Sequence, residues 1–309
     1  MMVAVLRMTM RLNRDIADRY FLFRIRHDFQ SAFRQITGCM SDDCNRCVSR
    51  EECPYRLIFA QELSADPAAV KRHQKPPLPF AFSFPVFPSP PNVGHDFVIR
   101  LSLAGTATRF VGEFVEAVKF LFATQPERYG SLMDLERVDS LDYHDEPTLL
   151  WSKGGGVEAL DAVTLLETDG LRDTRLMGYS GEMKLQLETP LKLMHEGRAM
   201  REFKFTQFMR TLIRRISSLA AYYSDDDLSM DFRWLSSLSE TVVVSYNSAR
   251  WVEWGRGDGD GKLAGLTGDV KLKGIPDEFI PFLLLGEFLN LGKGAAFGLG
   301  RFSLSVDES

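Results

Sequence analysis

The stretch LGKGAAFGLGRF, from Leu291 to Phe302, is the most informative part of this 309-residue chain. It spaces four glycines as G-x-G-x3-G-x-G, with a lysine and an arginine among them. Glycine adopts positive φ without steric cost and lets backbone approach a ligand closely. Successive N–H groups in such a loop can form a concave site for anions. The residues of this predicted backbone site are Gly292, Lys293, Gly294, Gly298, Gly300 and Arg301.

The segments on either side of this glycine loop exclude the common nucleotide-binding loops. An apolar run at Phe279–Leu289 predicts a helix before the loop, and Arg301–Val306 predicts a strand after it. The mononucleotide loop needs a Gly-Lys-Ser/Thr ending after a strand, and the dinucleotide fingerprint follows a strand and opens a helix. Here the helix comes first, so neither reading fits.

A glycine loop between a helix and a final strand resembles the RAMP superfamily, the RNA-binding proteins of CRISPR systems. The C-terminal third resembles the CRISPR repeat-processing endoribonuclease family, through Leu285-Gly286-Glu287, the GKG-x-x-FGLGR loop and the segment LETPLKL at Leu187–Leu193. This resemblance implies CRISPR repeat RNA as the partner, and other CRISPR effector subunits as further partners. It also implies metal-independent cleavage by the RNA's own 2′-hydroxyl, which leaves a 2′,3′-cyclic phosphate.

Length and composition indicate a two-domain globular protein. The chain is 45% hydrophobic, which suffices for buried cores. Its longest apolar run is too short for a bilayer span. The N-terminal segment carries Arg7 and Arg11 inside its apolar pattern, so it predicts a strand and no secretion signal. We therefore expect a cytoplasmic protein without a membrane partner.

Charge is unevenly distributed along the chain. The net charge is −5, yet residues 192–215 hold seven basic residues and two acidic ones. A local basic surface can bind phosphates on an acidic protein, because such interactions act over short distances at cellular salt. The alternative is ordinary solvated charge on helix faces. The candidate RNA contacts in this segment are Lys192, Arg210 and Arg214.

The order of predicted elements gives two βαββαβ halves, and hence an α+β fold of two ferredoxin-like (RRM-like) domains. The first half, residues 1–168, has strands at Val3–Leu12, Phe97–Ala104 and 132–141, with helices at 17–36 and 109–122. The Pro-rich 75–94 predicts edge structure or an ordered loop. A joining strand is predicted at 157–166. The second half, residues 169–309, has strands at 183–193, 241–251 and 263–272, a helix at 203–223, and the last helix, glycine loop and strand.

The predicted first helix carries a polar row on the face opposite its apolar side. At 100° per residue, the spacing places the members of this row one above another. Cleavage by the 2′-hydroxyl needs a base, an acid and cations for the phosphorane charge. His27 is the candidate base, Tyr20 could assist proton transfer, and Arg24 and Arg34 are the candidate cations and RNA contacts. The alternative is a solvated helix face with an idle histidine.

Two departures from the resembling family bear on activity. Many relatives have a histidine just before the glycine loop, where this chain has Asn290. Relatives also often carry an Arg-Tyr-Ser-x-Arg-Gln segment before the third strand of the second domain, and here GRGDGDGK, at Gly255–Lys262, stands in that region. Either the chemistry depends on His27, or the protein is a non-catalytic RNA-binding RAMP subunit of an effector complex. A third hypothesis is a zinc-stabilised interaction module without an RNA partner.

All the cysteines lie close together in the sequence. Four thiols spaced C-x4-C-x2-C-x5-C in one loop are typical of a metal knuckle. Cytoplasmic thiols stay reduced, which disfavours disulfides. We predict a structural zinc at these thiols. The alternatives are a four-cysteine iron–sulfur cluster and no metal. No cofactor is expected in catalysis. The predicted ligands are Cys39, Cys44, Cys47 and Cys53.

Overall fold

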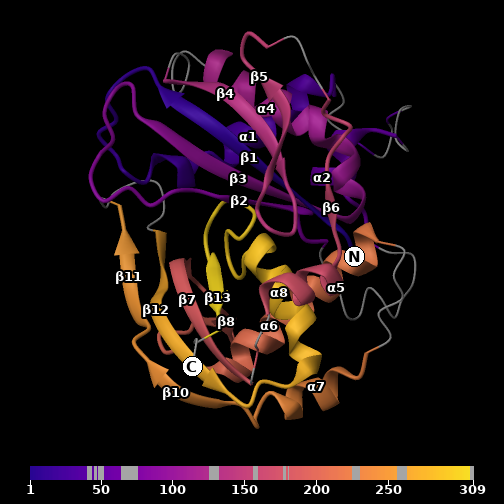
Figure 1. Cartoon of the computed structure of the whole chain (residues 1–309), viewed down its shortest axis with the longest axis vertical. Helices are drawn as coiled ribbons and strands as arrows, with labels where there is room; N and C mark the ends of the chain where they lie inside the picture. The colour runs from indigo at the N-terminus through magenta and orange to yellow at the C-terminus, as the bar shows by residue number, and fades with distance from the viewer. Residues whose placement is uncertain are drawn as a thin grey trace.

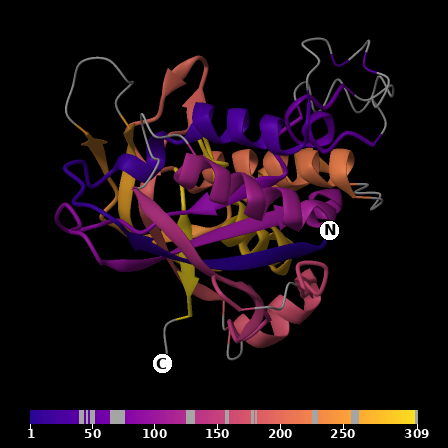
Figure 2. The same ribbon diagram turned by 90° about the horizontal axis from the view of Figure 1, so that it is seen from above.

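The computed structural model describes residues 1–39, 44, 47, 52–63, 76–124, 132–155, 159–176, 179, 181–224, 230–255 and 263–306. Each half of the chain builds one antiparallel sheet with helices against it, and the first half stands above the second in Figure 1. Figure 2 shows α1 (Arg26–Ile36), α4 (Val111–Thr124) and α6 (Phe205–Tyr223) on the same side of the molecule. Among the described residues, no helix is both long and apolar enough to cross a bilayer.

The first sheet has the strand order β2-β3-β1-β4-β5, and β6 also pairs with β1. The first four strands of the chain are the four strands of a βαββαβ unit. Counted from the β4 side, they lie in the order β4-β1-β3-β2, which is the 4-1-3-2 order of a ferredoxin-like unit. Strand β2 pairs only with β3 among the named strands, as its flanking prolines predict for edge structure. The elements are β1 (Val3–Leu12), the 3-10 turn η1 (Phe21–Arg24), α1, α2 (Pro54–Phe59), β2 (Phe80–Ser83), β3 (Asp96–Ala104), η3 (Gly105–Phe110), α4, β4 (Met133–Leu141), β5 (Pro147–Ser152) and β6 (Leu165–Leu166).

The second sheet repeats this order as β13-β7-β12-β10, with β11 also paired to β12. Helix α6 places Phe208, Leu212, Ile216 and Leu219 in the core at helical spacing. The tandem ferredoxin-like fold predicted from the sequence is therefore confirmed. The elements are α5 (Thr168–Arg175), β7 (Glu182–Leu191), β8 (Met194–His195), β9 (Arg198–Ala199), α6, α7 (Phe232–Leu238), β10 (Val243–Asn247), β11 (Arg250–Trp254), β12 (Leu263–Lys273), η4 (Asp277–Phe279), α8 (Ile280–Leu289) and β13 (Phe302–Ser305).

Several predicted elements differ from the structure. The first helix begins at Arg26 and not near residue 17, because η1 and the non-helical turn before it occupy the preceding residues. In place of a joining strand at 157–166, only Leu165–Leu166 pairs with β1, and residues 156–158 lie outside the described part. Helices α5 and α7 were not predicted. The sequence signal for α7 is Asp231, whose Oδ1 accepts hydrogen bonds from the N–H groups of Arg233 and Trp234.

The glycine loop joins the two domains. Ala296 and Phe297 belong by sequence to the second domain but lie in the hydrophobic core of the first. The N–H of Phe82 on edge strand β2 donates to Ala296 O at 3.0 Å. Asn290, fully buried, donates from Nδ2 to Phe82 O at 2.8 Å and to Ala295 O at 2.9 Å. The loop thus extends the first sheet's edge and inserts an aromatic ring into the first core.

Helix α6 supports the start of this loop through a partly buried arginine. Arg215 donates from Nε and Nη2 to the carbonyl oxygen of Leu289, at 3.2 and 2.9 Å. That carbonyl ends α8, where backbone acceptors lack helical partners. Burial lowers the pKa of Arg215 to about 10, so the guanidinium stays charged at neutral pH. The contact fixes the chain direction at Asn290, which has a positive φ of 54°.

An ionic cluster also spans the two halves. Arg175 of α5 lies 3.3 Å from Asp145 and 3.7 Å from Glu287 of α8, the glutamate of the Leu-Gly-Glu segment. Burial raises the pKa of Glu287 to about 7, while the N–H of Leu304 and the charge of Arg175 oppose the rise. Arg100 on β3 pairs with the same aspartate at 3.6 Å.

The raised pKa of Glu287 predicts a pH dependence of stability. The folded protein holds this proton up to about pH 7, whereas an unfolded glutamate loses it near pH 4.3. The contribution of Glu287 to folding stability is therefore fully present at low pH, and it is lost as pH rises between these two pKa values. The free energy of unfolding of wild type and of Glu287→Gln can be measured with denaturant between pH 4 and 8. As pH rises, the wild type should lose stability relative to the glutamine variant. Parallel curves would exclude this titration.

Candidate RNA-cleavage site

The turn before α1 meets the second domain at a cluster of aromatic rings. Tyr20 stacks on Trp254 of β11, with ring centroids 4.9 Å apart and an interplanar angle of 13°. Phe23 contacts the same indole edge-on at 5.6 Å and also meets Phe84 at 5.3 Å. A Cβ added to Gly298 of the glycine loop would lie 2.5 Å from Phe84 and 3.1 Å from Phe23. The turn, β11 and the glycine loop therefore converge here.

The predicted polar row is not continuous in the structure. Tyr20 lies before the helix, is 7% exposed, and its hydroxyl accepts a hydrogen bond from Arg19. Arg24 lies in η1 and pairs with Asp18 at 3.1 Å. The row assumed one helix with 100° per residue, and a 3-10 turn has a different period. The buried, stacked Tyr20 does not share a solvent face with His27.

His27 lies in the first turn of α1, and its side chain is exposed. Arg34 lies two turns further on and contacts protein groups. Its Nε donates to Cys39 O at 3.2 Å, and its guanidinium lies 5.8 Å from the centre of the Tyr55 ring. Of the candidate residues Tyr20, Arg24, His27 and Arg34, His27 is thus the one with an exposed side chain; Ser31, the fifth member of the predicted row, is exposed as well.

The glycines of the loop have the predicted backbone conformation, but most face protein. Gly292, Gly294, Gly298 and Gly300 have φ of 85°, 86°, 83° and 66°. A Cβ at Gly300 would lie 1.7 Å from Leu291 O, and one at Gly292 would lie 2.7 Å from Lys192 O. These glycines are therefore required by the loop's own packing. Whether its N–H groups also contact RNA stays a prediction.

The two basic residues of the loop point to different surroundings. Arg301 pairs with Glu188 at 2.9 Å, and burial lowers its pKa. Lys293 is exposed, and its N–H donates to the carbonyl oxygen of Lys192 at 3.1 Å. Lys192 and Lys293 thus lie side by side where β7 leaves the sheet. This pair is a candidate phosphate contact, whereas Arg301 already has a carboxylate partner.

The candidate arginines of α6 also differ. Arg210 donates from Nε to Ser236 Oγ at 2.6 Å and pairs with Glu240 at 3.2 Å, so it is held against α7. Arg214, one turn later, is exposed, and within the described part of the chain it pairs with no carboxylate. Arg214 is therefore the better candidate for a phosphate contact.

This difference gives a testable prediction. Each phosphate contact adds about one to the slope of log affinity against log salt concentration. Arg214→Ala should lower the slope for repeat RNA by about one, and Arg210→Ala should change it much less. Arg233→Ala, an exposed arginine on α7, is the charge-matched control. Fluorescence anisotropy titrations at several salt concentrations measure the slopes, and equal slopes for wild type and Arg214→Ala would make Arg214 only a solvated charge.

The four cysteines are each partly buried and carry free thiols. Burial raises the pKa of Cys44, and the thiols of Cys39, Cys53 and Cys47 raise it further. In the described part of the chain, however, no group of three or more His, Cys, Asp or Glu side chains is arranged to hold a metal ion. Residues 40–43, 45, 46 and 48–51 of this loop lie outside that part. Zinc at these thiols stays a prediction.

The zinc prediction has a direct test. Purified protein should contain about one zinc per chain and no iron–sulfur absorption bands. Cys44→Ser should lose the metal and lower the unfolding temperature, because a structural zinc contributes to folding free energy. Elemental analysis and thermal unfolding measure both. Metal-free wild type, as stable as Cys44→Ser, would refute the site.

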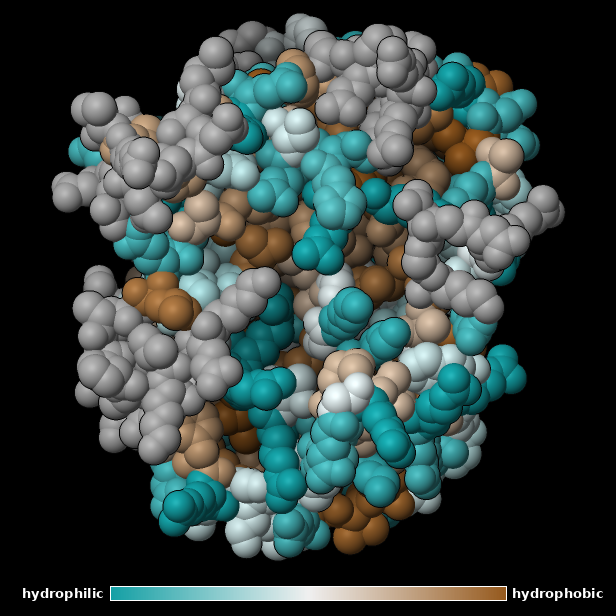
Figure 3. Space-filling view, turned by 180° about the vertical axis from the view of Figure 1, so that it is seen from behind, coloured by the Kyte–Doolittle hydropathy of each residue, from teal (hydrophilic) through white to brown (hydrophobic). Residues whose placement is uncertain are grey.

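Trp254, Asp18 and Arg19 were not predicted as members of this site. The signal for Trp254 is the WVEW segment of β11, which places two tryptophans next to the glycine-rich GRGDGDGK. Residues 256–262 of that segment lie outside the described part. Figure 3 shows the molecule from behind, where hydrophobic residues show in the hollow between the two halves and hydrophilic ones cover much of the surrounding surface.

Two stacked ferredoxin-like units closed by a glycine loop define the class as a tandem RAMP-type protein. Residues 185–302 match the family model of the CRISPR-associated endoribonuclease Cas6. Residues 3–163 match the family model AF_1859_N, described as an N-terminal domain. Residues 185–302 therefore belong to the Cas6-type family of CRISPR-associated RAMP proteins.

Solved structures agree on the fold at low sequence identity. The product complex of Cas6 TTHB231, from Thermus thermophilus, has a TM-score of 0.56 at 14% identity, covering 98% of this chain and 99% of that one. The Cas6 TTHA0078 product complex gives 0.53 at 16%, covering 99% and 100%. A partial Cas6-RT-Cas1–Cas2 complex gives 0.59 at 12%, covering 100% of this chain and 47% of that one. No curated protein sequence matches significantly.

Proposed function

We propose that this protein binds CRISPR repeat RNA and cuts it once during processing of the precursor RNA. The match of residues 185–302 to the Cas6 endoribonuclease model supports RNA processing as the general function. Two of the similar solved structures are described as Cas6 product complexes, and another places Cas6 with Cas1–Cas2. CRISPR repeat RNA is the proposed substrate, and other CRISPR proteins are proposed partners.

The proposed chemistry needs no metal-bound water. His27 removes the proton from the 2′-hydroxyl upstream of the cut, since imidazole exchanges protons near neutral pH. The 2′-oxygen then bonds to phosphorus, and the bond from phosphorus to the 5′-oxygen breaks. The leaving oxygen takes a proton from water, and His27 then gives its proton to the hydroxide that remains, which restores the neutral imidazole. The products are a 2′,3′-cyclic phosphate and a 5′-hydroxyl.

The single observation that carries this mechanism is the exposure of His27 in the first turn of α1, directly after the turn that contacts Trp254 of the second domain. Arg24 lies within the same segment and holds Asp18 at 3.1 Å. To stabilise the phosphorane, its guanidinium would exchange that carboxylate for phosphate oxygens, a favourable substitution for a developing dianion. Tyr20 takes no part in this scheme because its hydroxyl is buried against Arg19.

A second candidate function is RNA binding without cleavage, as in a RAMP subunit of an effector complex. The observation that favours it is Asn290, which is fully buried with its Nδ2 bound to two carbonyl oxygens. It therefore reaches no substrate and cannot replace the histidine that many relatives have there. Incubation of the pure protein with its host repeat RNA separates the outcomes: the RNA is cut, bound uncut, or ignored.

A further inference from the structure

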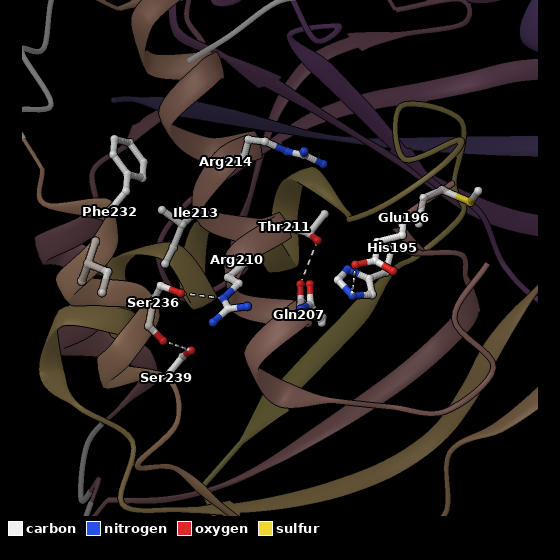
Figure 4. A pocket seen from close by; sticks show the side chains of 12 residues that line it. His195, Glu196, Gln207, Arg210, Thr211, Ile213, Arg214, Phe232, Ser236 and Ser239 are labelled. Carbon is white, nitrogen blue, oxygen red and sulfur yellow. Dashed lines mark hydrogen bonds and ion pairs between the residues drawn. The ribbon is translucent and has the colours of Figure 1, made fainter. Parts of the chain in front are cut away.

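A pocket of about 580 Å³ lies in the second domain, away from the His27 junction. Helices α6 and α7 form its two walls, and the β8–β9 hairpin forms its rim (Figure 4). This volume is within the range of small-molecule sites in proteins. The cleavage chemistry proposed above uses none of its residues.

The lining combines apolar surface with hydrogen-bonding groups. Ile213, Leu235 and Phe232 supply the apolar part, and Gln207 and Thr211 lie beside them on α6. The hydroxyl of Thr211 donates to the backbone carbonyl oxygen of Gln207 at 2.8 Å. This bond does not involve the side-chain amide of Gln207. An apolar wall with a few fixed polar groups suits the flat face and polar edge of a nucleobase.

Cationic groups lie at one side of the pocket. Arg214 extends from α6 toward the side on which His195 and Glu196 lie in Figure 4. Arg210 is held by Ser236 and Glu240, so its charge is balanced within the protein. Glu196 is 85% exposed on the hairpin, where solvent screens it. Arg214 is thus the group best placed to meet a phosphate beside the pocket.

The pocket is connected to the glycine loop through the backbone. Lys293 of the loop binds the carbonyl of Lys192 at 3.1 Å, and Met194 of the pocket rim follows two residues later, within about 7 Å along an extended chain. An RNA strand that contacts Lys192 and Lys293 therefore passes the rim. Met194 is 48% exposed there and offers a polarizable surface to a base.

We infer that this pocket receives one unstacked nucleotide of the bound repeat RNA. Its base lies between the apolar wall and Gln207, and its phosphate lies beside Arg214. The inference rests on the proposed RNA-binding function and adds a subsite to it. Single-stranded RNA is commonly recognised by splaying out a base into such a site.

The test combines abasic nucleotides with a variant that fills the pocket. Repeat RNAs with one abasic nucleotide at each position are titrated against wild type, and one position should lose about tenfold in affinity, as stacking of a base predicts. Gln207→Trp, which places an indole in the pocket, should lose a similar factor with intact RNA. With the RNA that is abasic at the sensitive position, Gln207→Trp and wild type should bind with equal affinity. Ser237→Trp, on the exposed side of α7, should behave as wild type.

A second measurement does not depend on any variant. Repeat RNA carrying 4-thiouridine at the sensitive position should crosslink to α6 or α7 of wild type, as located by mass spectrometry. Affinity of folded Gln207→Trp for intact RNA within twofold of wild type would overturn the subsite alone. So would a loss from Gln207→Trp that is as large with every abasic RNA as with intact RNA. Failure of wild type to bind repeat RNA would instead overturn the proposed function and the subsite together.

Discussion

Replacing His27 with alanine is expected to slow single-turnover cleavage of the repeat RNA by about 10²–10⁴-fold, the usual effect of losing a general base. RNA affinity should stay within about threefold, because the exposed imidazole is one contact among many. The measurement is the first-order rate with enzyme in excess over end-labelled RNA. His27 lies at the start of α1, so the substitution leaves the core unchanged.

His144→Ala is the matched control, since this histidine is also exposed and lies on another face of the first domain. Its rate should equal that of wild type. If His27→Ala cuts at the wild-type rate, the base is another residue. A fall in RNA affinity as large as the fall in rate would make His27 a binding residue.

Replacing Phe297 with alanine is expected to lower the free energy of unfolding by about 3–5 kcal/mol, the range for large-to-small changes of a buried phenylalanine. Phe297 is 4% exposed and lies 5.6 Å from the ring centre of Phe80 and 6.4 Å from that of Phe82. Both neighbours belong to the first domain, so the cavity would open in the core that the loop enters.

Urea unfolding followed by tryptophan fluorescence measures this loss, and Phe110→Ala, at a partly exposed phenylalanine of the same domain, should cost less. Because Phe297 joins the domains, the unfolding of its alanine variant should also become less cooperative. A loss below about 1 kcal/mol would mean that the loop is not needed to hold the domains together.

The order of elements and the glycine loop could be predicted from the sequence for local reasons. Alternating residues at Val3–Leu12 and helical spacing in α6 are properties of the segment itself. Four glycines at 292, 294, 298 and 300 indicated positive φ, which all four have. Chain order then leaves few topologies, and the 4-1-3-2 order follows in both halves.

The site residues could not be predicted equally well because their partners lie far away in sequence. Gly298 faces Phe84, and Asn290 binds Phe82, across the domain boundary. The partner of Arg210 is Glu240, thirty residues later. Local periodicity carries no information on such contacts, and it also misplaced Tyr20 by extending a helix through a 3-10 turn.

The measurement that tests the central claim most directly is incubation of wild-type protein with its repeat RNA in the presence of a metal chelator. We predict one cut per repeat at an unchanged rate, with a 2′,3′-cyclic phosphate on the upstream fragment and a 5′-hydroxyl on the downstream one. Mass spectrometry of the fragments identifies these ends. Tight binding without a cut, or a cut that leaves a 5′-phosphate, would contradict the account.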